Sequence, residues 1–366
     1  MAKPSSLSQY EESIKIHRDA IDAIDGALLR LLNERAQHAL EIGRVKNEQM
    51  VWRPEREAQV LQRIIKDNTG PLDNETITYL YRQFMSACRA LEKKLSVAYL
   101  GPAGTFSELA VSRQFGIFVD TISFASVEEV MRSVEKKQSD FAVVPIENST
   151  EGAIGQTHDL MIDTTLTICA EVKLRIQQNL IAQASSLETI KKVFSHPQSL
   201  AQCAQWLSRH LPNTQCVPVA SNAEAARLAS EEENTAAIAG ENAAARYHLS
   251  IIASHIEDMP NNTTRFWVLG RDSPVPSGRD LTSLVMSAPN QSGAMYTLLA
   301  PLAKHSVSMT RLESRPARQG LWEYYFFVDI EGHCDDAPIK VALKELKALA
   351  PFLKVLGSYP AAVSEQ

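Results

Sequence analysis

Apolar residues at the start of the chain recur at helical spacing. From residue 8 to 47, isoleucine, leucine, valine and alanine fall three, four and seven positions apart, which predicts one long helix. A helix of about forty residues is expected to pair with another helix or with another chain. Two more helices are predicted at residues 54–68 and 73–95, the first of them opening on Pro54 and ending before Gly70.

The spacing of the apolar residues changes after residue 95. Short apolar runs there are typical of buried strands, and helical stretches separate them, which indicates a parallel α/β architecture. The runs are Val97–Leu100, Phe141–Ile146, Val193–Phe194 and Ala236–Ala239.

A segment rich in proline and glycine, residues 272–278, predicts a linker before the last part of the chain. The pattern after it is strand, helix, strand, strand, helix, strand, which is the order of a ferredoxin-like α+β fold. These elements are expected at residues 281–287, 293–304, 307–313, 321–329, 337–349 and 354–359. We therefore expect a multidomain chain, with an all-α domain at residues 1–95, an α/β domain at 96–272 and an α+β domain at 280–360.

Composition places the chain among ordinary globular proteins, because 45% of its residues are hydrophobic and 22% are charged. The net charge of −6 argues against nonspecific binding to nucleic acid or to a membrane surface. We expect no membrane span and no signal peptide. Five irregularly spaced cysteines without a CxxC pair predict reduced thiols and a cytoplasmic protein, and the histidines predict no metal site.

Basic residues on the first predicted helix are candidates for binding an anion. Arg35 and Lys46 share a face, whereas Arg18 lies about 25 Å from Arg35 along the helix and about 100° around it. One small ligand cannot touch both arginines of the same chain, so a functional Arg18 would serve a partner subunit. The alternative is a solvated, charged helix. Glu92, four residues after Cys88, is either a functional carboxyl group or a buried partner of an arginine.

These residues, with the Arg56-Glu57 pair and the Cys88…Glu92 spacing, resemble the all-helical chorismate mutase family. The resemblance implies three helices from each of two intertwined chains, and the rearrangement of chorismate to prephenate without a cofactor. It also implies roles for single residues. The carboxylates would be held by Arg18 of the partner subunit and by this chain's own Arg35, with Arg56 nearby. Lys46 would stabilise the ether oxygen, and Glu57 would contact the ring hydroxyl.

Two positions depart from the pattern of this family. Glu92 stands where the family often has Gln, and a Glu must be protonated to donate the same hydrogen bond to the ether oxygen. We therefore expect mutase activity that falls as the pH rises. Arg53 stands where some members have Asp, which leaves one contact to the hydroxyl open.

Polar segments follow strands in the middle of the chain, where open α/β sheets bind ligands. They are Gly101–Ser107, Val144–Thr150, Ser195–Gln198 and Asn262–Phe266. The first lacks the GxGxxG pattern, so we expect no dinucleotide site. Taken singly, the segments are also explained by helix caps, a turn or an ion-paired strand end.

Together and in this order, the four segments resemble prephenate dehydratase. The resemblance implies two α/β subdomains around a cleft, as in periplasmic binding proteins, and the conversion of prephenate to phenylpyruvate. It assigns Thr264 as proton donor to the leaving hydroxyl, and we assign Arg265 to a carboxylate. Glu147, Asn148, Ser195 and Gln202 would line the site. Threonine is a weak acid and would need a polar relay, which the sequence does not identify.

Two motifs in the last domain carry a third resemblance, to the regulatory ACT domain that binds L-phenylalanine. The first motif consists of Gly293, Ala294 and Met295 with the tyrosine that follows, and the second consists of Glu313, Ser314, Arg315 and Pro316. Free N–H groups at the helix start suit an amino-acid carboxylate, and Gly293 allows a close backbone approach. Met295 stands where the family more often has Leu. The alternative is a turn and a basic loop.

The three resemblances follow the order of the bifunctional chorismate mutase–prephenate dehydratase family. They imply chorismate and prephenate as substrates, L-phenylalanine as an allosteric inhibitor, and a homodimer or a larger oligomer. No cofactor, metal, nucleic acid or membrane is expected. One alternative is a dehydratase that prefers arogenate. Another is a ligand-binding regulator with a periplasmic-binding-protein-like core and an ACT sensor.

Overall fold

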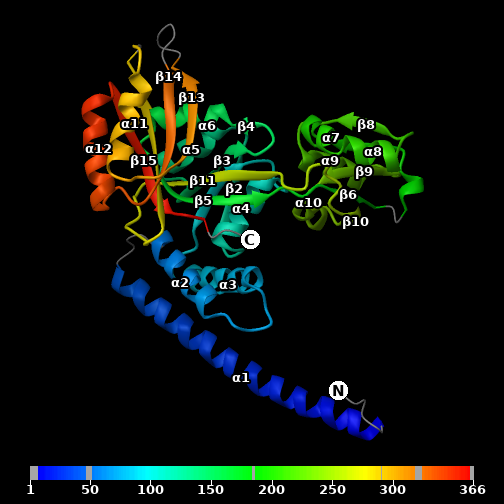
Figure 1. The fold of residues 1–366 in the computed structure, drawn as a ribbon. Coiled ribbons are helices and arrows are strands. Elements are labelled where there is room, and N and C mark those ends of the chain that lie inside the picture. The colour runs from blue at the N-terminus through cyan, green and yellow to red at the C-terminus, as the bar shows by residue number, and fades with distance from the viewer. Residues whose placement is uncertain (1–6, 47–51, 184–185, 290, 318–323, 363–366) are drawn as a thin grey trace.

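The computed structural model describes residues 7–46, 52–183, 186–289, 291–317 and 324–362. Within these residues the chain forms a helical part, a central part with two sheets, and a C-terminal α+β part (Figure 1). The expected multidomain fold class is confirmed.

The helical part contains three helices close to the predicted positions. They are α1 (Leu7–Lys46), α2 (Pro54–Asp67) and α3 (Asn74–Glu92). Pro54 occupies the first turn of α2, where its missing N–H costs nothing. Asp73 caps α3, because its carboxylate accepts the Thr76 N–H at 2.7 Å. The predicted helices are confirmed.

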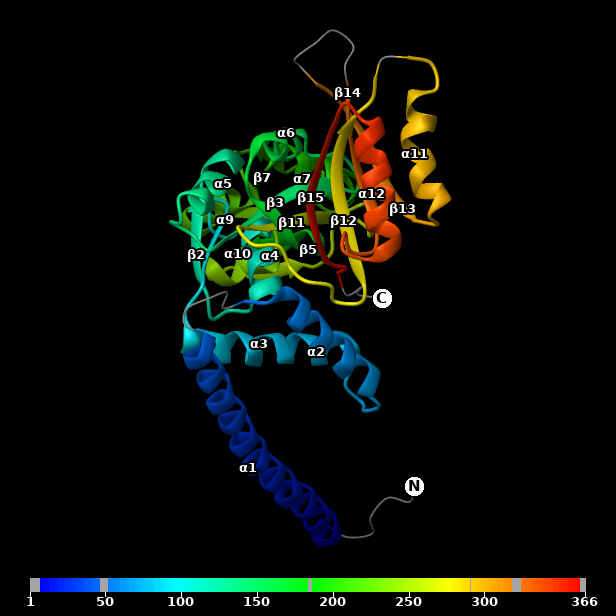
Figure 2. The ribbon, with the colours of Figure 1, turned by 90° about the vertical axis from the view of Figure 1, so that its left-hand side faces the viewer.

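Helix α1 leaves most of its apolar side chains uncovered. It packs on α3 near its C-terminal end, while its N-terminal half extends away from the molecule (Figures 1 and 2). Ile21, Ile24 and Leu28 are 55%, 57% and 49% exposed. An apolar stripe of this length on a single helix needs a partner surface.

The central part consists of two sheets with helices packed on them. The first sheet has the order β2-β1-β3-β11-β5, and β4 pairs with β3. Its strands are β1 (Ser96–Leu100), β2 (Asp120–Phe124), β3 (Phe141–Asn148), β4 (Gly152–Ala153), β5 (Thr167–Arg175) and β11 (Thr263–Gly270). Its helices are α4 (Phe106–Phe115), α5 (Val127–Glu135) and α6 (Gly155–Asp163).

The second sheet has the order β10-β6-β9-β7-β8. Its strands are β6 (Asn179–Ala182), β7 (Lys192–Ser195), β8 (Gln215–Pro218), β9 (Thr235–Ala239) and β10 (Ser250–Ala253). Its helices are the 3₁₀ turn η1 (Leu187–Thr189), α7 (Pro197–Gln202), α8 (Ala204–His210), α9 (Asn222–Glu231) and α10 (Glu241–Arg246).

The predicted parallel pairing holds for β1 with β2 and β3 and for β7 with β8 and β9, but not for the other strands. The chain passes to the second sheet after β5 and returns along β11, which runs antiparallel to both β3 and β5. Likewise β6 runs antiparallel to β9 and β10. Two segments, residues 176–178 and 254–262, therefore connect the subdomains, as Figure 1 shows. A two-segment connection of this kind permits hinge motion across the space between the sheets.

The C-terminal part has the predicted ferredoxin-like order, with β13-β14-β12-β15 antiparallel in one sheet. Its elements are β12 (Asp280–Ser287), α11 (Ala294–Lys304), β13 (Met309–Pro316), β14 (Tyr324–Glu331), α12 (Ala337–Leu349) and β15 (Phe352–Pro360). The predicted strand at 321–329 begins outside the described residues. Figure 2 shows α11 and α12 on one face of this sheet and the central part on the other.

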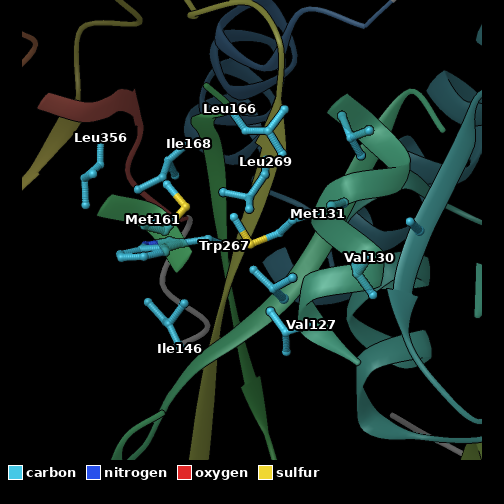
Figure 3. Close-up of a cluster of buried hydrophobic side chains, with 14 of the residues drawn as sticks. Val127, Val130, Met131, Ile146, Met161, Leu166, Ile168, Trp267, Leu269 and Leu356 are labelled. Atoms are coloured by element: carbon cyan, nitrogen blue, oxygen red, sulfur yellow. The ribbon is translucent and has the colours of Figure 1, made fainter. Parts of the chain in front are cut away.

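One hydrophobic cluster joins the C-terminal sheet to the first central sheet. Trp267 of β11, Ile168 of β5 and Met161 of α6 lie in the same buried group as Leu356 of β15 (Figure 3). All four side chains are at most 2% exposed. Because they form a single core, the C-terminal sheet is held against the back of the strands that reach the central cleft.

Candidate active sites

Helices α1 and α3 bring three predicted mutase residues to one seam. Arg35 Nη1 of α1 donates to the Sγ of Cys88 on α3 at 2.9 Å. One further turn along α3, Glu92 packs on the backbone of Gly43, where an added Cβ would lie 2.5 Å from Glu92 Cγ. Gly43 was not predicted from the sequence. Any larger side chain at residue 43 would have to displace the Glu92 side chain.

Three other predicted mutase residues lie elsewhere on the helices. Arg18 is exposed on the N-terminal half of α1, away from the stretch that packs on α3. Lys46 is the last residue of α1, and its side chain lies outside the described residues. Arg56 is exposed on α2. Arg18 and Arg35 share one straight helix, so they remain too far apart for one ligand within a single chain.

Glu57 departs from its expected role. Its carboxylate is buried and accepts hydrogen bonds from Trp52 Nε1 at 3.0 Å and from Arg89 Nη1 at 3.1 Å. Arg89 also donates to the Phe115 carbonyl at 2.7 Å, and the Trp52 ring lies 4.6 Å from that of Phe115. Through its Oε2, Glu57 therefore helps to join the helical part to the central part.

A cleft of about 420 Å³ opens between the two central sheets. Thr264 of β11 and Asn148 of β3 lie opposite each other on its wall. The Asn148 amide is oriented by its neighbours, because its Oδ1 accepts the backbone N–H groups of Thr150 at 3.0 Å and Glu151 at 3.3 Å. Its Nδ2 consequently donates to Thr264 Oγ1 at 3.0 Å and to Asn262 Oδ1 at 2.8 Å.

A network of amides forms the opposite wall. Gln178 Nε2 donates to Ser199 Oγ at 3.0 Å and to Gln202 Oε1 at 3.3 Å, and Asn222 Nδ2 donates to Ser199 Oγ at 2.8 Å. The Nε2 of Gln202 is buried and has no hydrogen-bond partner in the described part of the chain. A buried donor without a partner is costly unless a ligand accepts from it. Gln202 was predicted, whereas Gln178, Ser199 and Asn222 were missed.

Ser195 does not line the cleft. It is fully buried, and its Oγ is within hydrogen-bond distance of Asn222 Oδ1 at 3.0 Å and of the Ile238 carbonyl at 2.9 Å. Ser195 therefore lies behind the cleft wall, where it holds the side-chain amide of Asn222 in place.

Arg265 and Glu147 also point away from the cleft. Successive side chains of a strand alternate between its two faces, so the neighbours of Thr264 and Asn148 must face the other way. Arg265 donates to Glu171 Oε2 at 2.9 Å and to Asp329 Oδ2 at 3.0 Å, and it pairs with Glu147 at 3.2 Å. In this structure Arg265, which was assigned to a carboxylate, and Glu147, which was expected in the site, therefore lie on the reverse face of the two strands.

Helix N-termini supply the cleft with positive potential. Among the described residues that line it there is no lysine or arginine. Helices α4 and α9 begin at the cleft wall with Phe106 and Asn222, and the shorter α7 and α10 start there too. Free N–H groups and the helix dipole at such ends favour carboxylates. His196 and Ser107, taken from the polar motifs, lie at two of these ends.

The two predicted effector motifs lie at corresponding ends of α11 and β13. Gly293 precedes α11 with a φ of 78°, a left-handed conformation that favours glycine. Ala294 and Met295 start that helix, and Glu313, Ser314, Arg315 and Pro316 end β13. Since β13 runs back along α11, both motifs lie at the same end of the sheet. Arg315 forms two hydrogen bonds with the Asp159 carboxylate of α6, at 2.9 and 3.1 Å.

One group of potential metal ligands occurs among the described residues. The ligand atoms of His333, Cys334 and Asp335 all lie within 4.8 Å of one another. Both ring nitrogens of His333 already hold the loop in place, since Nδ1 accepts the Asp335 N–H at 3.1 Å and Nε2 donates to the Pro274 carbonyl at 3.2 Å. The imidazole of this group is therefore already engaged with the backbone.

Family comparisons cover most of the chain. A sequence model of chorismate mutase type II matches residues 17–93, one of prephenate dehydratase matches 97–274, and one of the ACT domain matches 282–350. No helix in the described residues is both long and apolar enough to cross a bilayer.

Curated relatives share this architecture over their whole length. The chain is 51% identical to the bifunctional chorismate mutase/prephenate dehydratase of Neisseria gonorrhoeae, over 98% of this chain and 100% of that protein. It is 46% identical to the Stutzerimonas stutzeri enzyme of that description, over 96% and 99% of the two chains, and 34% identical to the Escherichia coli K12 enzyme, over 94% and 95%.

Solved structures match the central and C-terminal parts. A prephenate dehydratase from Arthrobacter aurescens in complex with L-Phe superposes with a TM-score of 0.67 at 34% identity, covering 74% of this chain and 93% of that one. A protein described as a novel type of quorum quenching acylase, GqqA, superposes equally well at 29% identity, covering 73% and 98%. Taken with the full-length relatives, these matches show that the chain belongs to the bifunctional chorismate mutase/prephenate dehydratase family.

Proposed function

We propose that the cleft between the two central sheets dehydrates and decarboxylates prephenate, with Thr264 as the proton donor. The observation that carries this assignment is the hydrogen bond from Asn148 Nδ2 to Thr264 Oγ1 inside the cleft. The ring carboxylate leaves as CO2, and the electron pair of the breaking carbon–carbon bond enters the ring and expels the hydroxyl. Thr264 protonates the departing oxygen to water and regains a proton from solvent.

Asn148 supplies the polar assistance that a threonine needs. The hydroxyl of Thr264 accepts from Asn148 and donates to no other protein group within the described residues, so its proton is free to point at a ligand. As that proton leaves, negative charge develops on Oγ1 while the Asn148 N–H already lies 3.0 Å away. A donor fixed in advance beside developing charge lowers the barrier.

The two carboxylates of prephenate are assigned to neutral donors. The N-termini of α4 and α9 face the cleft, and the unpartnered Nε2 of Gln202 supplies a further donor on the opposite wall. These groups replace the guanidinium that the sequence suggested. Binding then depends on closing the cleft, because the donors come from both subdomains.

The seam between α1 and α3 is assigned to the mutase reaction. Arg35 is assigned to a carboxylate of chorismate and Glu92 to the ether oxygen, and the contact of Arg35 with Cys88 and the packing of Glu92 on Gly43 support these assignments. Lys46 follows Gly43 by about one helical turn and is assigned to the same oxygen. Arg18 completes the site from a partner chain, so the active form is a homodimer whose α1 helices cover each other's apolar stripes.

The C-terminal part is assigned to feedback control by L-phenylalanine, bound at the Gly293–Met295 and Glu313–Pro316 motifs. The L-Phe complex of the related dehydratase supports this assignment. We place the domain boundaries at residues 95–96 and 272–280, which agree with the breaks between the elements.

A single assay tests these assignments. Purified protein is given chorismate without added cofactor, and chorismate loss and phenylpyruvate formation are followed with and without L-phenylalanine. Both should proceed, and L-phenylalanine should slow the second. Accumulation of prephenate would contradict the assignment of the cleft, and arogenate offered in parallel would then show whether it is the preferred substrate.

A further inference from the structure

Charged side chains fill the reverse face of the two strands that carry the dehydratase residues. Thr264 pairs with Asn148 across β11 and β3, and the next pair, Arg265 with Glu147, faces the opposite way. Each charged residue is therefore joined by one peptide bond to a residue of the cleft wall. A displacement of the charged pair must move the cleft pair as well.

The C-terminal domain completes this charged cluster. Arg311 of β13 forms an ion pair with the Glu147 carboxylate, and Asp329 of β14 accepts from Arg265 at 3.0 Å. The side chains of Arg265 and Arg311 are each 15% exposed. Because these side chains are largely buried, a charge that left its partner would leave the other charge uncompensated. The charged groups are therefore held in fixed positions.

Arg265 stays charged inside this cluster. Its burial alone would lower its pKa, but the carboxylates of Glu171 and Asp329 outweigh that effect and raise the pKa above the usual value. The cluster is thus a permanent electrostatic link between the back of the cleft wall and the C-terminal sheet.

The same strand β13 contacts a second part of the cleft wall. Arg315, four residues after Arg311, is bonded to Asp159 of α6. Its guanidinium also lies over Gly155, where an added Cβ would come within 2.2 Å of Nη1. Helix α6 begins at Gly155, directly after residues 151–154, which line the cleft. One strand of the regulatory domain therefore touches both segments that shape the catalytic wall.

We propose that Arg311 and Arg315 of β13 are positioning residues for the dehydratase reaction, acting on the cleft through Glu147 and through α6. A ligand bound at the end of β13 then changes dehydratase turnover by shifting this strand. The inference rests on the proposed function, since it uses the assignment of Thr264 and Asn148 to prephenate. It adds the contacts through which a ligand bound at the effector site acts on the cleft.

Turnover of Arg311→Gln tests the positioning role. Its dehydratase kcat should fall about fivefold or more while KM stays within about twofold, since the substrate donors lie elsewhere. Mutase turnover in the same protein should not change. The unfolding midpoint should fall, because Glu147 loses a partner, so both turnovers are measured well below the midpoint of the variant. Arg311→Lys should recover part of the loss. Arg279→Gln is the matched control, because Arg279 is exposed and lines the neighbouring cavity between the domains.

A double-mutant cycle tests whether Arg311 acts through Glu147. Glu147→Gln should lower kcat by a similar factor, and the double variant should lose no more than the worse single variant. Losses that multiply would overturn the proposal, as would unchanged kcat in both single variants. If Arg311→Gln does not fold, Arg311→Lys and Arg315→Lys carry the same comparison.

The proposed effect of a ligand at β13 is tested by measuring the binding of L-phenylalanine and its inhibition of the dehydratase separately. Arg311→Gln should bind L-phenylalanine in calorimetry about as well as the wild type, while the inhibition at saturation becomes several-fold weaker. Undiminished inhibition in Arg311→Gln would overturn the proposal. Wild-type protein that binds no L-phenylalanine would instead refute the effector assignment, and the kcat comparison would still decide whether β13 positions the cleft.

Discussion

At the scale of single residues, strand alternation decides which side chains reach the substrate. Thr264 and Arg265 are adjacent in one motif, yet one faces the cleft and the other the C-terminal domain. The sequence identified both residues, and the period of two along a strand would have assigned only one of them to the cleft. Ser195 could not be placed in this way, because its burial depends on Asn222 and Ile238, which lie far along the chain.

Replacing Thr264 tests the proton donor directly. Thr264→Val should lower dehydratase kcat on the order of a hundredfold or more, the typical cost of losing one preorganised polar group, while mutase turnover stays the same. Thr264→Ser should keep most of the activity. Thr263→Val is the matched control, since its side chain does not line the cleft. Equal losses in the two valine variants would contradict the assignment.

The proposed role of Glu92 as a hydrogen-bond donor is tested by comparing it with a glutamine. A protonated carboxyl donates to the ether oxygen and an ionised one cannot, so wild-type mutase activity should fall as the pH rises. Glu92→Gln should give a flatter profile. Glu92→Ala should lose on the order of a hundredfold at low pH, because the donor is gone. Identical pH profiles for wild type and Glu92→Gln would show that ionisation of Glu92 does not matter.

At the scale of elements, helices and the C-terminal sheet followed from periodicity, whereas the direction of strands did not. The order and type of the elements after residue 280 match the prediction, because each strand and helix there is set by its own local pattern. The antiparallel course of β11 depends on where the chain returns from the second sheet, which no local pattern records. The exposed stripe of α1 is the element-scale feature that predicts a partner.

Mixed dimers test whether α1 carries an arginine into the neighbouring site. Arg18→Ala and Arg35→Ala should each abolish most mutase activity alone. Mixing the two after dissociation should restore about a quarter of the wild-type activity, because half of the dimers then contain one intact site of two. No recovery, with heterodimers shown to form, would place Arg18 outside the site.

A charged side chain introduced into the apolar stripe of α1 tests whether the stripe is buried in a dimer. Ile24→Asp should dissociate the dimer and remove mutase activity, since the stripe can no longer be buried. Arg30→Gln is the control, because Arg30 is exposed on the same helix and pairs only loosely with Glu34. Sedimentation of both variants measures the oligomer. A dimeric, active Ile24→Asp would contradict the role given to α1.

At the scale of the whole molecule, the C-terminal domain is docked on the dehydratase by a core that includes a buried histidine. His158 of α6 lies between Trp267 and Phe327, with ring distances of 5.3 and 4.7 Å. Burial, together with Arg311 and Arg315, lowers its pKa to about 4, although the hydrogen bond to the Ile154 carbonyl and the charge of Asp329 act in the opposite direction. His158 is therefore neutral in the folded protein over most of the accessible pH range.

Acid should weaken this docking. Above pH 6.5 His158 is neutral whether the chain is folded or unfolded, and its contribution to stability is fully present. As the pH falls from 6.5 toward 4, the unfolded chain gains a proton that the folded chain does not, which costs roughly 3 kcal/mol at most. The unfolding midpoint, followed by circular dichroism, should fall less steeply with acid in His158→Phe. His210→Phe, a change at an exposed histidine, should keep the wild-type slope.

The absence of lysine and arginine among the described residues that line the dehydratase cleft has a consequence for salt. Helix ends carry only partial charges, whereas the arginines assigned to the mutase carry full charges, so salt screening weakens the attraction of a dicarboxylate more at the mutase site. Raising the salt should therefore increase KM for chorismate more than KM for prephenate. The mutase and dehydratase sites of one chain would then respond differently to the same rise in ionic strength, and the binding of chorismate would be the step that weakens more.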